Sequence, residues 1–185
     1  MKRITIILVF LSQNLLAAEA GRLTMSGEGC GSQRFPGTLP NLSENSHKAV
    51  IPFFFKLEKS ADNKIGRKAC NLAWPIKLNK KEKVQISNIQ QDVLLTHSQG
   101  TLVKANLSLF FAGAKKTKDF KAELTADEKS ETLQKIWNED SFFMESGCGK
   151  DTIFRGNFNA NVTGDSTGAA ESESLKFNIK IVPCE

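Results

Sequence analysis

Tyrosine is absent from this 185-residue chain, and histidine occurs only twice, at His47 and His97. Without tyrosine, the chain has no phenolic group for acid–base chemistry. No two of the four cysteines form a C-x-x-C pair, and two isolated histidines add few ligands, so a zinc site is disfavoured. After residue 16, no apolar run is long enough to span a bilayer. These gaps predict no metal, no other cofactor, and no transmembrane segment in the mature chain.

The first twenty residues have the pattern of a secretory signal peptide. Basic Lys2-Arg3 precede an apolar stretch over Ile4–Leu16, and Ala18-Glu19-Ala20 fits the small-x-small cleavage pattern. An uncleaved membrane anchor is the alternative, but the apolar stretch is short and interrupted by polar residues. We therefore expect residues 1–20 to be a signal peptide, cleaved after Ala20. Residues 21–185 then form one secreted or periplasmic domain, since they contain no repeat and no linker.

The four cysteines stand at positions 30, 70, 148 and 184. An even number of cysteines in an exported chain predicts two disulfides, with zinc binding as the rival interpretation. Four cysteines allow three pairings. The entropy of loop closure does not choose between them, because it grows slowly with loop length.

The stretch Arg67–Leu78, "RKACNLAWPIKL", has the alternation of a β-strand. Side chains in an extended chain alternate between two faces, so Cys70 and Trp74 share one apolar face. Trp74 could stack on a sugar, but its apolar neighbours predict a place in the core. Further strands are predicted over 48–57, 84–95, 101–111, 152–162 and 175–181, with a long polar turn over 163–174.

Three local features interrupt this strand pattern. Pro52 cannot donate to a ladder, and the strand over 48–57 is predicted to be buried on both sides or to lie at an edge. Pro75 marks its strand as an edge or a bulge. The apolar parity changes near Ser87-Asn88, which predicts a bulge there. A short surface helix is predicted over Ala126–Trp137, where a capping box and apolar residues at helical spacing occur together. The predicted fold is an antiparallel β-sandwich or barrel with one short helix and two disulfides.

An ordered set of short motifs runs through the chain: Gly27-Glu28-Gly29-Cys30, Arg67-Lys68-Ala69-Cys70, Phe110-Phe111-Ala112-Gly113, Cys148-Gly149 and a last cysteine at Cys184. This order resembles the secreted domain-of-unknown-function family 4360 of fungi and bacteria. The resemblance implies an exported, disulfide-bonded, β-rich domain without an established activity. It also implies pairing of neighbouring cysteines, Cys30 with Cys70 and Cys148 with Cys184.

Catalytic patterns are weak. Gly164-Asp165-Ser166-Thr167-Gly168 matches G-x-S-x-G, but a strand rather than a helix is predicted to follow, and no histidine follows Ser166. His47 or His97 would have to act as the base. The acidic pairs Asp127-Glu128 and Glu139-Asp140 are typical of solvated surfaces. The sequence therefore predicts no catalytic residue.

Lysines cluster in two turns, and an anionic glycan, a lipid head group or a nucleic acid could bind there if the turns meet. The alternative is a pair of charged hairpin tips that keep strand edges soluble. No aromatic residues are interleaved with these lysines, which argues against nucleic acid. The candidate anion-binding residues are Lys80, Lys81, Lys83, Lys115, Lys116 and Lys118.

The predicted function is that of a non-enzymatic binding or cell-surface-associated protein. Its partner would be an anionic surface polymer or another secreted protein. One alternative is a secreted hydrolase whose site is assembled from distant residues. Another is a structural envelope protein without a ligand. The N-x-S/T acceptor pattern at Asn41, Asn106 and Asn161 adds possible glycosylation sites.

Overall fold

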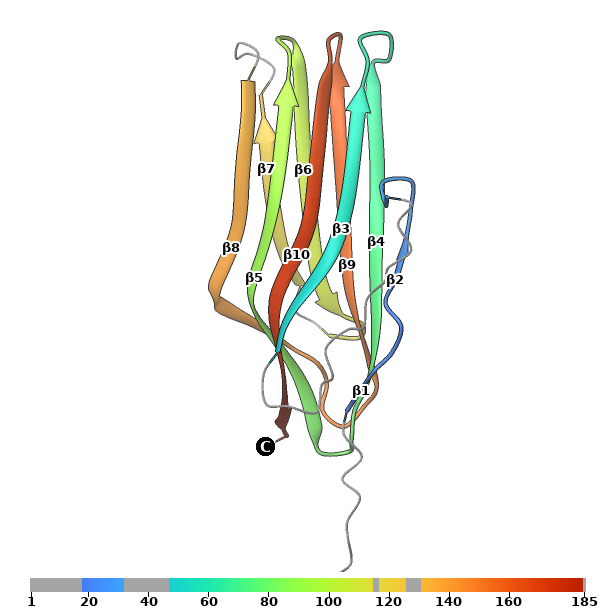
Figure 1. Ribbon diagram of the computed structural model, residues 1–185, viewed down its shortest axis with the longest axis vertical. Coiled ribbons are helices and arrows are strands. Elements are labelled where there is room, and N and C mark those ends of the chain that lie inside the picture. The colour runs from blue at the N-terminus through green and yellow to red at the C-terminus, as the bar shows by residue number, and fades with distance from the viewer. Residues whose placement is uncertain (1–17, 32–46, 115–116, 126–130, 185) are drawn as a thin grey trace, which may run out of the picture.

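Ten antiparallel strands form two sheets in the computed structural model, which describes residues 18–31, 47–114, 117–125 and 131–184 (Figure 1). The strands are β1 (Glu19–Ala20), β2 (Thr24–Ser26), β3 (His47–Lys59), β4 (Ile65–Lys77), β5 (Glu82–His97), β6 (Thr101–Phe111), β7 (Thr117–Leu124), β8 (Glu131–Glu145), β9 (Thr152–Gly164) and β10 (Gly168–Pro183). The larger sheet has the order β1-β4-β9-β6-β7, with β2 also on β4, and the smaller has the order β3-β10-β5-β8.

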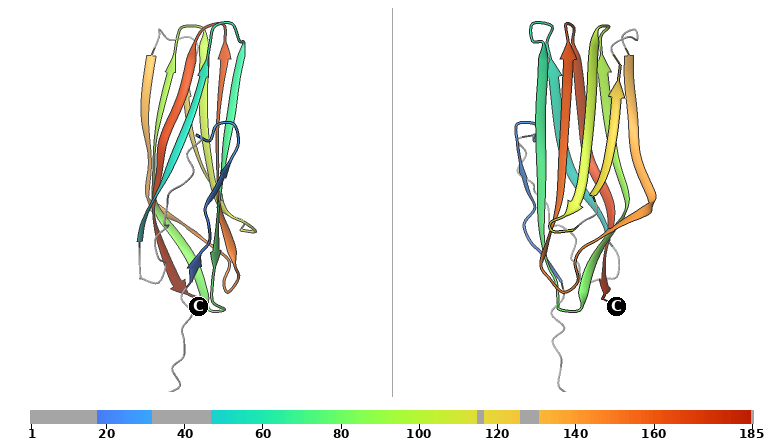
Figure 2. Two further views of the ribbon diagram at one scale, coloured as in Figure 1. Left: turned by 45° about the vertical axis from the view of Figure 1, so that its right-hand side comes forward. Right: turned by 180° about the vertical axis from the view of Figure 1, so that it is seen from behind.

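The two sheets lie face to face, as the turned views of Figure 2 show, and large aromatic side chains fill the space between them. Phe158 of β9 lies 4.5 Å from Phe55 of β3 and 6.1 Å from Trp137 of β8, measured between ring centroids. Trp74 of β4 lies 6.2 Å from Phe177 of β10. Trp74 is fully buried, as the shared phase with Cys70 predicted. The core is therefore built from the inward face of every long strand.

The structure contains two disulfides: Cys30 with Cys70, near the middle of β4, and Cys148 with Cys184, near one end of the sandwich. Both are the neighbour pairs that the family resemblance implied. The first fixes the segment after β2 to the core side of β4, where Cys70 is buried. The second joins the segment after β8 to the end of β10.

The predicted helix over Ala126–Trp137 is wrong where the structure describes it. Residues 131–137 belong to β8, and residues 126–130 lie outside the described part. The pairing of β8 with β5 runs from Glu131 opposite His97 to Glu145 opposite Gln85. It places Trp137 in the core and leaves Ile136 54% exposed on the opposite face. This long ladder and the burial of the tryptophan outweigh local helical spacing.

The long polar turn predicted over 163–174 is also shorter than expected. Strand β10 begins at Gly168, and its residues pair with β3 on one side and β5 on the other. Gly168, Ala170 and Ser172 are buried on one face, so small side chains there fit the inside of the sandwich. Within the described residues, no helix is long and apolar enough to cross a membrane.

The predictions of an edge strand at Pro52 and of a bulge near Ser87-Asn88 are confirmed, whereas that for Pro75 is wrong, because β4 has partners on both sides and no register shift at Pro75. Pro52 lies on the edge strand β3, opposite a register shift in β10. Pro75 lies on β4 between the short segments that pair with β1 and β2, and its carbonyl accepts a 2.8 Å hydrogen bond from the N–H of Gly21. The β5 register shifts between Ser87 and Ile89, where Asn88 has a φ of +51°.

We expect Asn88→Val to lower the free energy of unfolding by about 1–2 kcal/mol, because a β-branched residue tolerates a left-handed backbone poorly. Asn88 is exposed, so little packing changes with the substitution. Asn88→Gly is the matched control and should stay within about 0.5 kcal/mol of the parent protein. Guanidinium unfolding of the three proteins measures both. Equal stability of the valine and glycine variants would contradict the role given to the bulge.

Candidate functional site

The two histidines do not share a site. His47 pairs with Ile179 at one end of β10, and His97 pairs with Gly168 at the other. Eleven residues of extended strand separate these two partners, which corresponds to about 35 Å. A metal or an acid–base pair built on both histidines is therefore ruled out by the topology.

Ser166 and His97 do lie at the same end of the sandwich, beside a hollow of about 400 Å³ that His97 lines. The Ser166 contacts in the described structure are made by its backbone. Its carbonyl accepts a 2.5 Å hydrogen bond from Nζ of buried Lys59, and its N–H donates to Oγ1 of Thr101 over 3.2 Å. His97 Nδ1 lies 3.1 Å from the carbonyl of Ser98, which makes that nitrogen the donor. Between Ser166 and His97, both described, no nucleophile–base hydrogen bond is formed.

The polar groups around this hollow connect neighbouring turns of the chain. Lys59 Nζ also donates to the carbonyl of Ser60 over 3.0 Å, so one ammonium joins the turn after β3 to the turn before β10. The Ser98 and Thr167 hydroxyls, 2.8 Å apart, join the turn after β5 to the same segment. A second hollow, of about 350 Å³, adjoins Cys30 and is partly lined by Lys56. Hydrogen bonds to Glu58 and Glu171 raise the pKa of Lys56.

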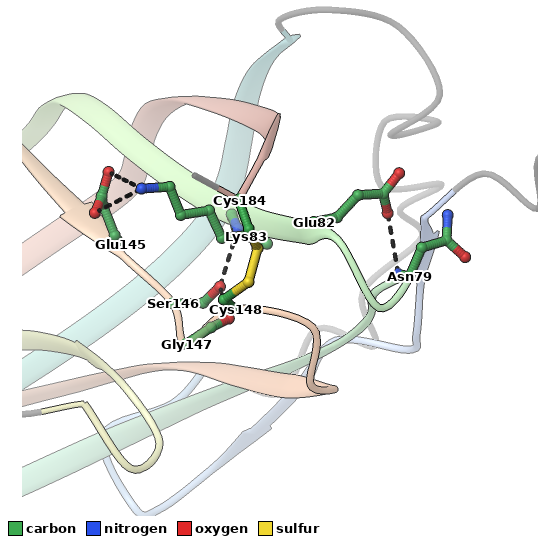
Figure 3. Close-up of a disulfide and its surroundings, with 9 residues drawn as sticks. Asn79, Glu82, Lys83, Glu145, Ser146, Gly147, Cys148 and Cys184 are labelled. Atoms are coloured by element: carbon green, nitrogen blue, oxygen red, sulfur yellow. Dashed lines mark hydrogen bonds and ion pairs between the residues drawn. A yellow bond between two sulfur atoms is a disulfide. The ribbon is translucent and has the colours of Figure 1, made fainter.

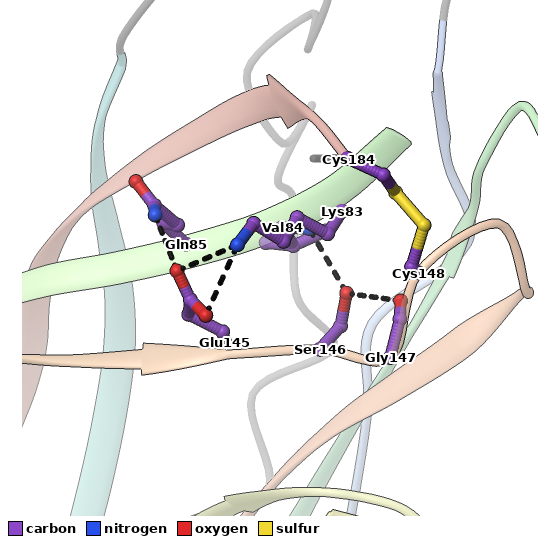
Figure 4. A network of polar contacts seen from close by, with 8 residues as sticks. All are labelled: Lys83, Val84, Gln85, Glu145, Ser146, Gly147, Cys148 and Cys184. Atoms are coloured by element: carbon purple, nitrogen blue, oxygen red, sulfur yellow. Dashed lines mark hydrogen bonds and ion pairs between the residues drawn. A yellow bond between two sulfur atoms is a disulfide. The ribbon is translucent and has the colours of Figure 1, made fainter. Parts of the chain in front are cut away.

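The lysine turn between β4 and β5 is engaged in local contacts, which Figures 3 and 4 show beside the disulfide of Cys148 and Cys184. Lys83 Nζ lies 3.1 Å and 3.2 Å from the two carboxylate oxygens of Glu145. Gln85 Nε2 donates to the same carboxylate over 2.5 Å. The Lys83 charge is therefore already matched within the protein.

Backbone contacts fix the same turn. The carbonyl of Lys81 accepts a 2.8 Å hydrogen bond from the N–H of Cys184, and Glu82 Oε2 accepts one of 3.0 Å from the N–H of Asn79. The N–H of Val84 donates to Oγ of Ser146 over 2.9 Å. Hydrogen bonds and the disulfide therefore fix the turn at this end of the molecule.

The second lysine cluster is described only in part. Lys115 and Lys116 lie outside the described residues. Lys118 belongs to strand β7, so its predicted place in a turn is wrong, and its Nζ lies 5.5 Å from the ring centroid of Phe120. The two turns do approach the same end of β9, because Ile76 pairs with Thr152 and Phe111 pairs with Phe154. Anion binding by Lys80, Lys81, Lys83, Lys115, Lys116 and Lys118 stays a prediction.

A different surface brings many polar side chains together: the outer face of the larger sheet, which faces the viewer in the rear view of Figure 2. From 157 to 161, strand β9 presents an asparagine at every second position, and the registers with β4 and β6 place further polar residues beside them. We name this surface the amide face. It is defined by Asn71 of β4, Asn106 and Ser108 of β6, and Asn157, Asn159 and Asn161 of β9.

The register arranges the amide face in three cross-strand rows. One row runs from Asn71 through Asn157 to Ser108. The next joins Asn159 to Asn106, whose Nδ2 donates to Asn159 Oδ1 over 3.3 Å. The spacing between neighbouring strands gives the surface a width of about 14 Å from β4 to the adjoining β7. The rise per residue along a strand gives the three rows a height of about 13 Å.

The inward neighbours of these asparagines anchor the strands in the core. Cys70, Phe158 and Ala160 alternate with the outward polar residues and are buried in the core. Asn71 and Asn159 are exposed, and Asn157 is half-buried. The alternation of the strands therefore directs these side chains to the outer side of the sheet, where Oδ1 of Asn161 is itself buried with no hydrogen-bond partner in the described structure.

The borders of the amide face carry charge and one aromatic ring. On β7, Asp119 accepts a 2.5 Å hydrogen bond from the Ser108 hydroxyl, and Glu123 lies 3.0 Å from Lys104 Nζ. The row below the amides places Arg155 beside Phe110, which is half-buried. The surface can thus offer amide donors, amide acceptors and the edge of an apolar platform at the same time.

No protein-family model matches the chain, and no curated protein matches it. The resemblance to the domain-of-unknown-function family 4360 therefore stays a prediction. Solved structures similar to this chain include carbohydrate-binding modules.

One is TmCBM61 in complex with β-1,4-galactotriose, at 10% identity and a TM-score of 0.30, covering 87% of this chain and 88% of that one. Another is the family 11 carbohydrate-binding module from Clostridium thermocellum in complex with a mixed-linked tetrasaccharide, at 10% identity and a TM-score of 0.22, covering 84% and 94%. The enzymatically active domain of tailspike protein 4 of bacteriophage CBA120 has 12% identity and a TM-score of 0.31, covering 86% of this chain and 19% of that one. Likeness at this level carries no argument about function.

Proposed function

We propose that this protein is an exported, non-enzymatic binding domain and that its amide face binds a hydroxyl-rich polymer, a polysaccharide, at or outside the cell surface. The observation that supports this is the convergence of five asparagines from three strands on the outer side of one sheet. Each side-chain amide offers two donors and an acceptor, and a sugar hydroxyl both donates and accepts. An array of such amides along one sheet therefore complements the hydroxyl-covered side of a polysaccharide chain.

Phe110 adds an apolar contact at the border of the same surface. Sugar rings have an apolar side that packs against aromatic side chains. Phe110 is half-buried, so part of its side chain is accessible to a ligand. The amides would set orientation, and the ring would exclude water from one end of the site.

Export is part of the proposal, and the two disulfides are consistent with it. Cleavage after Ala20 would remove β1 and leave Gly21 as the first residue, with its nitrogen 2.8 Å from the carbonyl of Pro75. We also propose membership of the secreted family 4360, on the order of the cysteine motifs. Amino-terminal sequencing of the exported protein tests the cleavage point.

We expect Asn71→Ala combined with Asn159→Ala to weaken polysaccharide binding by about tenfold or more, because each lost hydrogen bond is worth about 1 kcal/mol. Affinity electrophoresis measures this directly: the protein migrates through gels that contain purified soluble polysaccharides, and binding slows its migration. Protein made in a bacterial host that lacks N-glycosylation keeps Asn106 and Asn161 unmodified.

Asn178→Ala is the matched control for that experiment. Asn178 is half-exposed on β10 of the smaller sheet, far from the amide face, so its removal should leave migration unchanged. Both variants should keep the thermal midpoint of the parent protein within a few degrees, since these changes are at the surface. The proposal fails if no polysaccharide slows the parent protein, or if Asn178→Ala has the same effect as the double variant.

A further inference from the structure

Two arginines stand at opposite ends of the amide face. Arg67 of β4 pairs with Asn161, and Arg155 lies six residues before Asn161 on β9. Six residues of extended strand correspond to about 20 Å. Both arginines are exposed and lie on the same face as the asparagines between them.

Neither guanidinium has a carboxylate within 4.0 Å among the residues that the structure describes. This sets Arg67 and Arg155 apart from Lys104, whose ammonium lies 3.0 Å from Glu123. Another acid on this side of the sheet, Asp119, accepts a hydrogen bond from Ser108. Asp119 and Glu123 belong to β7 at the far edge of the sheet, and Glu19 of β1 lies 3.6 Å from Lys77, so these acids are held away from Arg67 and Arg155.

Charge and shape together suggest which kind of polysaccharide fits. An arginine binds a carboxylate through two parallel hydrogen bonds, and its charge does not titrate in the physiological range. Arg67 and Arg155 leave the amide rows between them for neutral hydroxyl groups. We infer that the polymer held by the amide face is an acidic polysaccharide, with carboxylate groups that reach the two arginines. This inference rests on the proposed function and specifies the ligand class of the same site.

A single-stranded nucleic acid is the other anionic polymer that could use two arginines. Such ligands are held by several aromatic side chains on which successive bases stack. The amide face offers one, Phe110, at its border. Asparagine amides spread over three rows suit a ligand with many hydroxyl groups, so the observations favour the polysaccharide.

The decisive experiment compares polymers that differ only in charge. Polygalacturonate and alginate are each offered beside their esterified forms, in which the same sugar chain carries neutral esters. We expect the parent protein to bind at least one acidic polymer about tenfold more tightly than its ester at low salt, as two exposed ion pairs would give. The preference should decline when salt is raised from 0.02 M to about 0.5 M, because screening shortens the reach of the charges.

Charge-removing variants assign this preference to particular residues. Arg67→Gln combined with Arg155→Gln should reduce the acidic preference to less than twofold while weak binding to the ester persists. Lys48→Gln combined with Lys180→Gln is the matched control, since it removes the same charge from exposed positions on the smaller sheet. That control should keep the preference of the parent protein.

The outcomes separate the two levels of the proposal. Equal binding of acid and ester forms, or an unchanged preference in the arginine variant, overturns the inference and leaves polysaccharide binding in place. Tighter binding of single-stranded DNA than of any polysaccharide also overturns it. If none of the polysaccharides binds the parent protein, the proposed function fails with it.

Discussion

Replacing Cys30 and Cys70 together by alanine is expected to lower the free energy of unfolding by about 4 kcal/mol. The disulfide joins positions 40 residues apart. Without it, the unfolded chain regains the entropy of opening a loop of that length. Cys70 is 1% exposed, so alanine also leaves its neighbours in the core less well packed. Guanidinium unfolding of the oxidised parent and the double variant measures the difference.

The second disulfide supplies the comparison for this prediction. Cys148 and Cys184 are 36 positions apart, so the unfolded chain gains nearly the same entropy when this disulfide is removed. The loss in free energy of unfolding from this source should therefore be similar. Cys148 is exposed and Cys184 is half-buried, so a mild reductant should open this bond first. Peptide mapping after partial reduction and alkylation follows the order. A loss below about 1 kcal/mol for the Cys30 and Cys70 variant, or earlier reduction of that pair, would contradict the account.

Phe158→Ala is expected to lower the free energy of unfolding by about 3–5 kcal/mol, the range for removing a large buried aromatic side chain. Phe158 lies on β9 at the centre of the larger sheet and contacts Phe55 and Trp137 of the smaller one. Its removal therefore weakens the contact between the sheets. Fluorescence of Trp74 and Trp137, both buried and the only tryptophans, reports the unfolding.

Phe54→Ala is the control for that substitution. Phe54 is 42% exposed on the edge strand β3, so its loss should cost about 1 kcal/mol or less. Phe158→Leu should fall between the two variants, since leucine fills part of the space that the ring leaves. Similar losses for Phe158→Ala and Phe54→Ala would show that the sheets are not held together at Phe158.

Several elements of the fold followed from local pattern. Alternation predicted β4 and β6, and a change in parity predicted the bulge at Ser87-Asn88, where Asn88 adopts the positive φ. Pro52 predicted the edge strand β3. These predictions succeeded because each depends on the backbone chemistry of a few neighbouring residues. The disulfide pairing came from the resemblance, since spacing left three pairings open.

The predicted helix over Ala126–Trp137 shows where local pattern was misleading. Leu133, Ile136 and Trp137 have helical spacing, but Trp137 and Leu133 are also in phase for a strand. Pairing with β5 favours the strand over the helix, because it forms a long ladder of hydrogen bonds and buries the apolar side chains. Strand β7 was missed for a related reason. Its buried Phe120, Ala122 and Leu124 alternate within a segment whose lysines were predicted to form a turn.

The amide face had a partial signal in the sequence. The run "NFNAN" from Asn157 to Asn161 places three asparagines on one face of any strand. Nothing in that run indicates that Asn71 and Asn106 lie beside it, because strand register is set by pairing between distant segments. The lysine clusters were more conspicuous in the sequence, but Lys83 is matched by Glu145 from another strand.

By itself, the sequence determined which side chains point inward and which outward along most strands, because that depends only on the two-residue period of an extended chain. The tertiary structure alone decided which strands are neighbours and in what register. Those choices placed Trp137 in the core and gathered the asparagines of three strands between Arg67 and Arg155. They arise from the burial of apolar surface and the pairing of backbone groups across long sequence separations, neither of which a local stretch of residues records.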